Sequence, residues 1–254
     1  MPPLRVNGRA GVVDLAGESV VAMTVRGPVA MLAEIGGGTE SRAEMQGKLR
    51  ELLGDAKTFA LRKAAFENGA TRTFVASRAE LEALQPVVSG KMPLAIDADR
   101  ASDIRAAMAL ARDMAIKIVV VGGAEAWQVA KELAAAKVPV MVGAMNNIPT
   151  SFNTLGSRQE NAAILRAAGV HVSLIGNGGG GENNFNARNI RYEAGNAVAY
   201  GMSWDEALRA ITLSPAETFG VADKVGTLQM GREGNVVVWS GDPFEFASQA
   251  EHVF

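Results

Sequence analysis

Residues 214–220 read SPAETFG, residues 226–231 read GTLQMG and residues 235–243 read NVVVWSGDP. These three segments decide the fold. Ser214 has the residue type that caps a helix, and Pro215 suits the first helical position, where a missing N–H costs nothing. Gly220 suits the end of that helix. Residues 236–239 are β-branched and aromatic, as in a buried strand, and a Gly-Asp-Pro turn follows.

Upstream of these segments, short apolar runs alternate with longer amphipathic stretches. The runs have the length and residue types of strands, and the stretches have the length of helices. We expect strands at 93–96, 117–121, 138–142 and 170–175. We expect helices at 101–114, 124–136, 161–168 and 184–200, and another at 203–211. This alternation predicts βα units around a parallel sheet that is covered on both faces.

The first 90 residues do not continue the alternation. Residues 10–15 and 19–26 are apolar runs that predict a hairpin, and residues 41–68 have the spacing of one helix with a kink at Gly54. Residues 77–80 form a capping box for the next helix. The sequence therefore predicts four βα units, whereas a closed βα barrel needs eight in about 250 residues.

Composition excludes several classes of protein. Of 254 residues, 48% are hydrophobic and 20% are charged, which is typical of a globular core. The net charge is −2 and no basic run occurs, so we expect no nucleic-acid partner. No run of about 18 apolar residues occurs, so we expect no membrane span. The chain has no cysteine and no signal peptide is recognisable, which leaves a cytoplasmic or an exported location open.

The order of the C-terminal segments resembles the signature of the amidohydrolase superfamily, in particular its imidazolonepropionase- and prolidase-like branch. The matching residues are Thr212, Pro215, Ala216, Gly220, Gly226, Leu228, Gly231 and Val237. The Ala-Asp pair of that signature is replaced by Gly234 and Asn235. The resemblance covers about residues 90–245. It implies an α/β fold of TIM-barrel-like parallel βα units, forming a partial barrel, with strands of a small β-domain.

This resemblance implies three regions. Residues 1–35 form a β segment that is part of the small β-domain or of the barrel edge, residues 36–215 form the partial barrel, and residues 216–254 form the C-terminal β-domain strand region. We expect the chain to be the C-terminal portion of a longer protein. An open half-barrel exposes sheet edges and apolar surface, so we expect a homo-oligomer or an N-terminal partner segment.

The resemblance also implies where catalysis occurs. Members of the superfamily bind one or two divalent metal ions, commonly zinc, through histidines on several strands and an aspartate on the last strand. The expected ligand positions fall on Asp97, Gly122 and near Asn177. These residues are poor zinc ligands as a set, because glycine has no side chain and asparagine is a weak donor. We therefore expect no metal site of the family type in this chain, and no other cofactor.

Other polar residues follow the four predicted strands. Active sites of βα barrels lie at these carboxyl ends. We predict Asp97 and Asn177 as catalytic residues. We predict the substrate-binding residues Asp99, Arg100, Glu125, Asn146 and Asn147. The carboxylates among them would bind Mg²⁺ or Ca²⁺, or act as acid and base; alternatively, they pair with the arginine or cap the next helices.

Two further features have alternative interpretations. His171 lies in the fourth predicted strand between apolar residues, which favours a hydrogen-bonded core histidine over a ligand. Residues 178–181 are four glycines, which indicate either a mobile loop or, with Arg188 and Arg191 on the next helix, an anion site. Together the resemblance and these residues predict a hydrolase domain that acts on carbon–nitrogen bonds of a small amide or peptide-like substrate. The alternative is a non-catalytic binding or scaffold protein.

Overall fold

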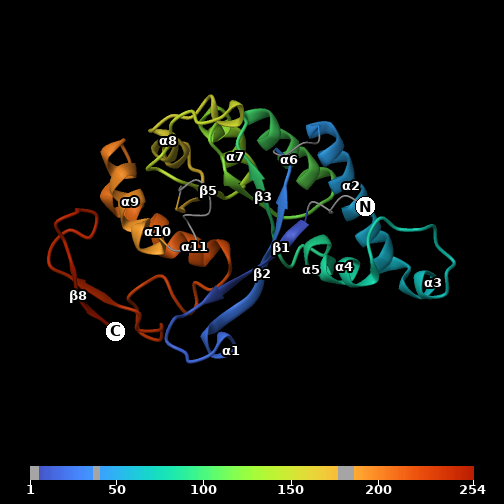
Figure 1. Cartoon of the computed structure of the whole chain (residues 1–254), viewed down its shortest axis with the longest axis horizontal. Helices are drawn as coiled ribbons and strands as arrows, with labels where there is room; N and C mark the ends of the chain where they lie inside the picture. Colours follow the sequence, from blue (N-terminus) through green and yellow to red (C-terminus); the bar gives the residue numbers. More distant parts are fainter. Residues whose placement is uncertain (1–5, 37–40, 177–185) are drawn as a thin grey trace. The chain divides into compact units, whose positions relative to one another are not determined.

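The computed structural model describes residues 6–36, 41–176 and 186–254 (Figure 1). The chain divides into two compact units, which we describe separately. The first comprises Met1–Ala98 with Ser102–Val120, and the second comprises Asp99–Ala101 with Val121–Phe254. The expected three-region division stays a prediction.

Among the described residues, six strands form one sheet in the order β1-β2-β3-β4-β5-β6, and two form a second sheet. The strands are β1 (Val6–Val13), β2 (Thr24–Glu34), β3 (Leu94–Ala98), β4 (Ile118–Gly122), β5 (Val140–Val142), β6 (Val172–Leu174), β7 (Val237–Trp239) and β8 (Ala250–Val253). β1 is antiparallel to β2, β2 is parallel to β3, and β5 is parallel to β6. The predicted α/β class, with parallel βα units and a small β-sheet, is confirmed.

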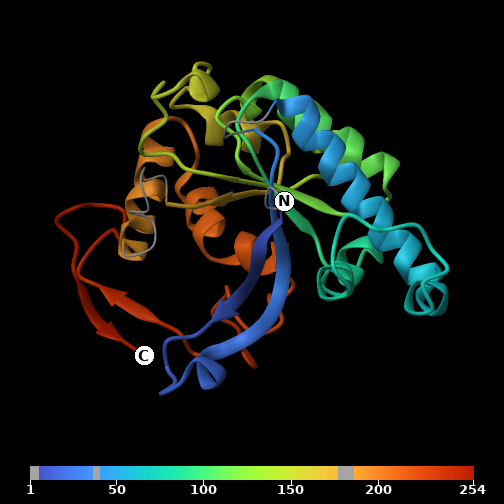
Figure 2. The same ribbon diagram turned by 45° about the vertical axis from the view of Figure 1, so that its right-hand side comes forward.

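The N-terminal hairpin differs from its prediction in one segment. Residues 20–23 form a short helix, α1 (Val20–Met23), in place of the start of the second strand. The Ser19 side chain accepts the Ala22 N–H and caps this helix, so β2 starts only at Thr24. β2 then runs beside β1 as a long curved ribbon (Figure 2). Its second half pairs with β3, from Met31 opposite Leu94 to Glu34 opposite Asp97.

In the helices of the first unit, the predicted capping box at residues 77–80 is present, but the predicted kink lies at another residue. After α1, the described helices of this unit are α2 (Arg42–Leu61), α3 (Lys63–Glu67), α4 (Arg78–Ala83), α5 (Gln85–Val88) and, from its second residue on, α6 (Ala101–Asp113). The helix predicted at 41–68 breaks at Arg62, whose φ is −129°, and not at Gly54, which lies inside α2. Ser77 and Glu80 cap each other's backbone N–H as predicted. Pro86 lies in the first turn of α5, where a ring without an N–H starts a new helix.

The core of the first unit forms where one face of α2 is buried. Its buried side chains include Met45, Leu49, Leu52, Leu53 and Phe59. Each contributes about 1.5–3 kcal/mol by leaving water. Asp55 is also fully buried, and its carboxylate accepts the Val75 N–H at 2.8 Å and pairs with Arg72. This buried carboxylate holds the segment after α3 against α2.

The second unit contains the other helices of the residues that the structure describes. They are η1 (Ala126–Val129), α7 (Ala130–Ala136), η2 (Phe152–Thr154), α8 (Asn161–Ala167), η4 (Ala187–Asn189), α9 (Ile190–Ala199), α10 (Trp204–Ile211) and α11 (Leu213–Thr218). Four of them, α8 to α11, pack on β6. Ser203 caps α10 as predicted, accepting the Glu206 N–H.

The C-terminal signature helix is α11, and its start differs from the prediction. Thr212 is the N-cap residue, so Ser214 lies inside the helix, where it is buried. Gly220 ends the helix as predicted, because its φ of +70° is one that glycine adopts without strain. The Gly220 N–H bonds to the Glu217 carbonyl and the Val221 N–H to the Ala216 carbonyl, which is the Schellman pattern.

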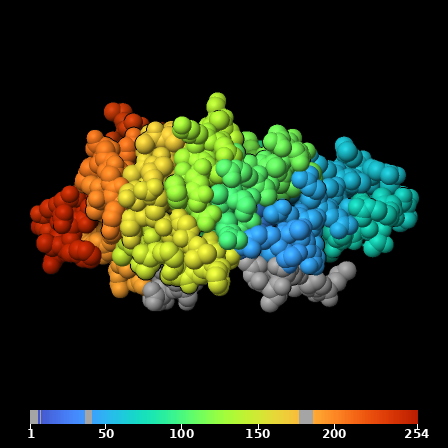
Figure 3. Space-filling model, turned by 90° about the horizontal axis from the view of Figure 1, so that it is seen from above, coloured from blue at the N-terminus to red at the C-terminus, as the bar shows by residue number. Residues whose placement is uncertain are grey.

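The strand predicted at 236–239 exists, but it is not buried. Val237 is 40% exposed and Val238 is 39% exposed. β7 pairs only with β8 in the part of the chain described, and a two-stranded sheet has no second layer to cover it. Figure 3 shows this C-terminal segment, in red, at the surface beside the orange helices of the same unit.

Candidate functional site

Asp97 is the predicted site residue of the first unit. It lies in β3 opposite Glu34 of β2, and its carbonyl accepts the Ile35 N–H at 3.3 Å. The other four residues of β3 are buried, whereas Asp97 is exposed. A carboxylate near the carboxyl end of a parallel strand is therefore accessible to a ligand.

In the second unit, Asp99 and Glu125 lie together and bind backbone groups. The Asp99 carboxylate accepts the Ala124 N–H at 3.2 Å, and the Asp99 carbonyl accepts the Glu125 N–H at 2.8 Å. The Glu125 carboxylate accepts the N–H of Ala101, the first residue of α6, at 3.0 Å. Each acidic side chain thus holds the loop that carries the other. Arg100, between them in sequence, is half-buried.

Asn161 holds the loop that follows β4. Its side chain is 1% exposed, accepts the Trp127 N–H at 3.0 Å and donates to the Gly123 carbonyl at 2.9 Å. Gly122 and Gly123 both have positive φ, so the chain turns sharply there. We did not predict Asn161 from the sequence; the available signal was a polar residue among apolar ones at the start of α8.

The loop that follows β5 carries the two predicted asparagines. Asn146 is exposed, and its carbonyl accepts the Ile148 N–H at 2.8 Å. Asn147 is buried, and its amide donates to the Gly143 carbonyl at 3.0 Å, which closes the loop. Glu193 of α9 is 2% exposed, and its carboxylate accepts the N–H groups of Ala144 and Met145. No sequence pattern singled out Glu193.

The histidine and arginine candidates have structural partners. His171 precedes β6, and its Nε2 lies 2.9 Å from the Ser214 carbonyl oxygen. Arg191 donates to the carbonyls of Pro243, Glu245 and Ser248 at 2.9–3.2 Å, so its guanidinium is used to hold the C-terminal segment. Asn177 and the glycines at 178–181 lie outside the described residues.

The metal-binding capacity of the described residues is small. Within them, no group of three or more His, Cys, Asp or Glu side chains could hold an ion. The residue at the end of β4 is Gly122, which offers no ligand atom, and the Asp99 and Glu125 carboxylates bind backbone N–H groups. The donor set in this part of the chain does not fit a catalytic zinc ion, which takes about three protein ligands.

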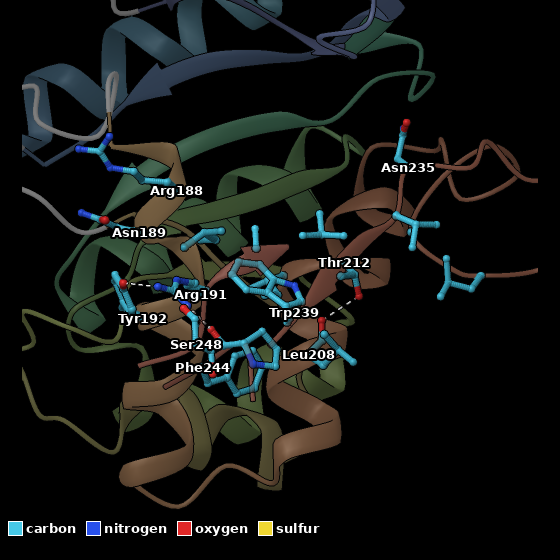
Figure 4. A pocket seen from close by; sticks show the side chains of 18 of the residues that line it. Arg188, Asn189, Arg191, Tyr192, Leu208, Thr212, Asn235, Trp239, Phe244 and Ser248 are labelled. Carbon is cyan, nitrogen blue, oxygen red and sulfur yellow. Dashed lines mark hydrogen bonds between the residues drawn. The ribbon is translucent and has the colours of Figure 1, made fainter. Parts of the chain in front are cut away.

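A large apolar pocket of about 1300 Å³ lies elsewhere in the second unit (Figure 4). It is lined by the start of α9, by α10 and by the segment around β7. The Arg191 guanidinium stacks on Trp239, 5.0 Å from the ring centre, and on Tyr192, which braces one wall. Arg188 and Arg191, named above for a possible anion site, line this pocket, whereas none of the predicted catalytic or substrate-binding residues does. We therefore place the candidate site at the strand ends and not here.

The fold and these strand-end loops define an α/β protein with TIM-barrel-like parallel units. Residues 42–254 match the model of the amidohydrolase family, and the chain belongs to that family. The superfamily prediction is confirmed, whereas the imidazolonepropionase- and prolidase-like branch stays a prediction. Members of the family are typically metal-dependent hydrolases. Among the described residues, every helix is too short or too polar to cross a bilayer.

Solved structures and a curated protein resemble this chain. An amidohydrolase from Thermotoga maritima MSB8 is 26% identical, with a TM-score of 0.87 over 98% of this chain and 67% of that chain. An uncharacterized protein, 17% identical, gives a TM-score of 0.54 over 87% of this chain and 50% of that chain, and shows the fold alone. Amidohydrolase tasK of Hapsidospora irregularis is 34% identical over 58 residues, which are 23% of this chain and 6% of tasK.

Proposed function

We propose that this chain is a hydrolase domain that acts on carbon–nitrogen bonds of a small amide or peptide-like substrate, and that the usual metal ligands of the family are missing from it. The family match over residues 42–254 carries this proposal. The polar residues at the ends of parallel strands support it, because that edge holds the active sites of βα barrels.

In this proposal the residues have different roles. Asp97 and Asn177 are catalytic, and the exposed Asp97 carboxylate accepts a proton from the attacking water. Asn146 and Arg100 contact the substrate. Asp99, Glu125 and Asn147, all of the second unit, are the other proposed substrate-binding residues, with side chains that also hold the loop backbone. The substrate is a small molecule, and a second copy of the chain or a partner segment completes the assembly.

A non-catalytic binding or scaffold protein is the second candidate. It is favoured by the hydrogen bonds of Asp99 and Glu125, because carboxylates that hold backbone N–H groups stabilise loops without taking part in catalysis. In this interpretation the protein retains the fold and the ligand-binding site of a hydrolase but catalyses no reaction.

Metal analysis and activity assays on the purified chain separate the two. We expect less than one tightly bound zinc ion per chain, and hydrolysis of some member of a panel of N-acyl amino acids and dipeptides. Asp97→Asn should lower kcat at least about 100-fold, whereas the control Asp205→Asn, at an exposed position of α10, should not. One zinc ion per chain would contradict the missing-ligand proposal. A metal-free, inactive chain would favour the scaffold.

A further inference from the structure

The carboxylate of Glu193 occupies an unusual position. It projects from α9, is 2% exposed, and binds the backbone of a loop that lies 48 to 49 residues earlier in the chain. Its Oε2 atom accepts both the Ala144 N–H and the Met145 N–H, the latter at 2.7 Å. Two successive N–H groups thus converge on one oxygen, as backbone N–H groups do around bound anions, and here the anion is part of the protein.

Burying this carboxylate is costly, so packing alone does not explain it. The other buried residues of α9 are Ala194 and Ala197, and an apolar side chain would serve the same face. A buried charge is tolerated only where hydrogen bonds replace its water. What Glu193 supplies, and an apolar residue would not, is a fixed position for the backbone that enters the loop with Asn146 and Asn147.

We infer that Glu193 is a positioning residue of the candidate site. It fixes the Ala144–Met145 backbone from one side, while the Asn147 amide closes the loop on the Gly143 carbonyl from within. Asn146, exposed between these two restraints, is thereby presented to the ligand. The link to a ligand rests on the proposed function; the positioning of the backbone does not.

Hydrogen exchange tests the positioning itself. Glu193→Leu removes the acceptor and keeps an apolar volume, whereas Glu193→Gln keeps one acceptor oxygen without the charge. We expect exchange of the Ala144 and Met145 amides to quicken at least about tenfold in Glu193→Leu and less in Glu193→Gln. The Val140 amide, which lies in β5 and donates to the carbonyl of His171 just before β6, should keep its rate. Unchanged exchange at Ala144 and Met145 in both variants would overturn the inference.

Kinetics on the best substrate test the route to the ligand. Glu193→Gln should raise KM about tenfold and leave kcat within about twofold, as should Asn146→Ala. If Glu193 acts through Asn146, the variant that combines Glu193→Gln with Asn146→Ala should have the same KM as Asn146→Ala alone. Additive increases in KM would overturn that route. If the unaltered chain hydrolyses nothing, the proposed function fails, and the exchange experiment still decides the role of Glu193.

Discussion

Gly156 lies so close to Glu125 that a Cβ atom added at residue 156 would be 2.7 Å from the Glu125 carboxylate oxygen. The Gly156 carbonyl also accepts the Trp127 indole N–H at 2.8 Å. The segment before α8 therefore rests on the loop that follows β4. The contact explains why residue 156 has no side chain, and it restrains the carboxylate that holds the start of α6.

We expect Gly156→Ala to destabilise the chain by about 1–3 kcal/mol, because Glu125 cannot move without releasing the Ala101 N–H. Adding Glu125→Ala removes the clash, so the double variant should lose less stability than the sum of the single variants. Urea unfolding of the four proteins measures this coupling. Strictly additive losses would show that the contact does not govern stability.

Two glycines of the C-terminal signature should respond differently to alanine. Gly226 has φ +96°, and an added Cβ would lie 3.0 Å from the Ala216 Cβ and 3.1 Å from the Leu213 Cα. Gly231 has φ +85°, with open space around it. We expect Gly231→Ala to cost about 1 kcal/mol for backbone strain, and Gly226→Ala about 3 kcal/mol because overpacking adds to strain. Thermal unfolding of both variants measures the difference; equal losses would contradict it.

Asn161→Ala should destabilise the second unit by about 2–3 kcal/mol. The substitution leaves the Trp127 N–H and the Gly123 carbonyl without their side-chain partner in a buried place. Asn68→Ala, at an exposed position after α3, is the control and should change stability by less than about 0.5 kcal/mol. Chemical denaturation gives both values, and a loss no larger than that of the control would refute the assigned role of Asn161.

The ion pair between Arg166 and Glu206 should make stability depend on pH. The hydrogen bond from Arg166 lowers the pKa of Glu206 below its ordinary value. The contribution of the pair is therefore present above the unfolded-state pKa and is lost as pH falls through the lower, folded-state pKa. Because both side chains are about one-third exposed, we expect only about 0.5–1 kcal/mol.

Arg166→Gln should thus be less stable than the unaltered chain at pH 7, and the difference should shrink below about pH 4. Glu206→Gln removes the titrating group and should show the same loss at pH 7. Denaturant unfolding at several pH values measures both. A difference that stays constant down to pH 2 would contradict the assignment to this pair.

Local patterns were enough to predict most elements. The runs that became β3 to β6 are short, apolar and β-branched, so their positions follow from local sequence. The capping residues Ser77 and Ser203 marked their helices for the same reason. The parallel pairing of β2 with β3 was not predicted, because a hairpin pattern identifies only the antiparallel neighbour β1.

The candidate site was less predictable than the fold. The positions of Asp99, Glu125 and Asn147 after the strands identified them as candidates, and helix capping was one interpretation of the carboxylates. The sequence did not reveal which backbone groups these side chains bind. Asn161 and Glu193 escaped prediction because their partners lie 34 to 49 residues away in sequence. Burial of β7 was predicted from composition alone, which says nothing about whether a second layer is present.

The Glu193 contact also constrains the order in which the molecule is completed. During translation, residues 143–147 are synthesised before α9, so this loop can be fixed only after Glu193 has been added to the chain. The loop after β4 likewise gains its hydrogen bonds only once Asn161 has been synthesised. Each of these loops is thus fixed by a helix that is synthesised after it. A chain that ends before residue 190 would contain Asn146 and Asn147 but not the carboxylate that positions their loop.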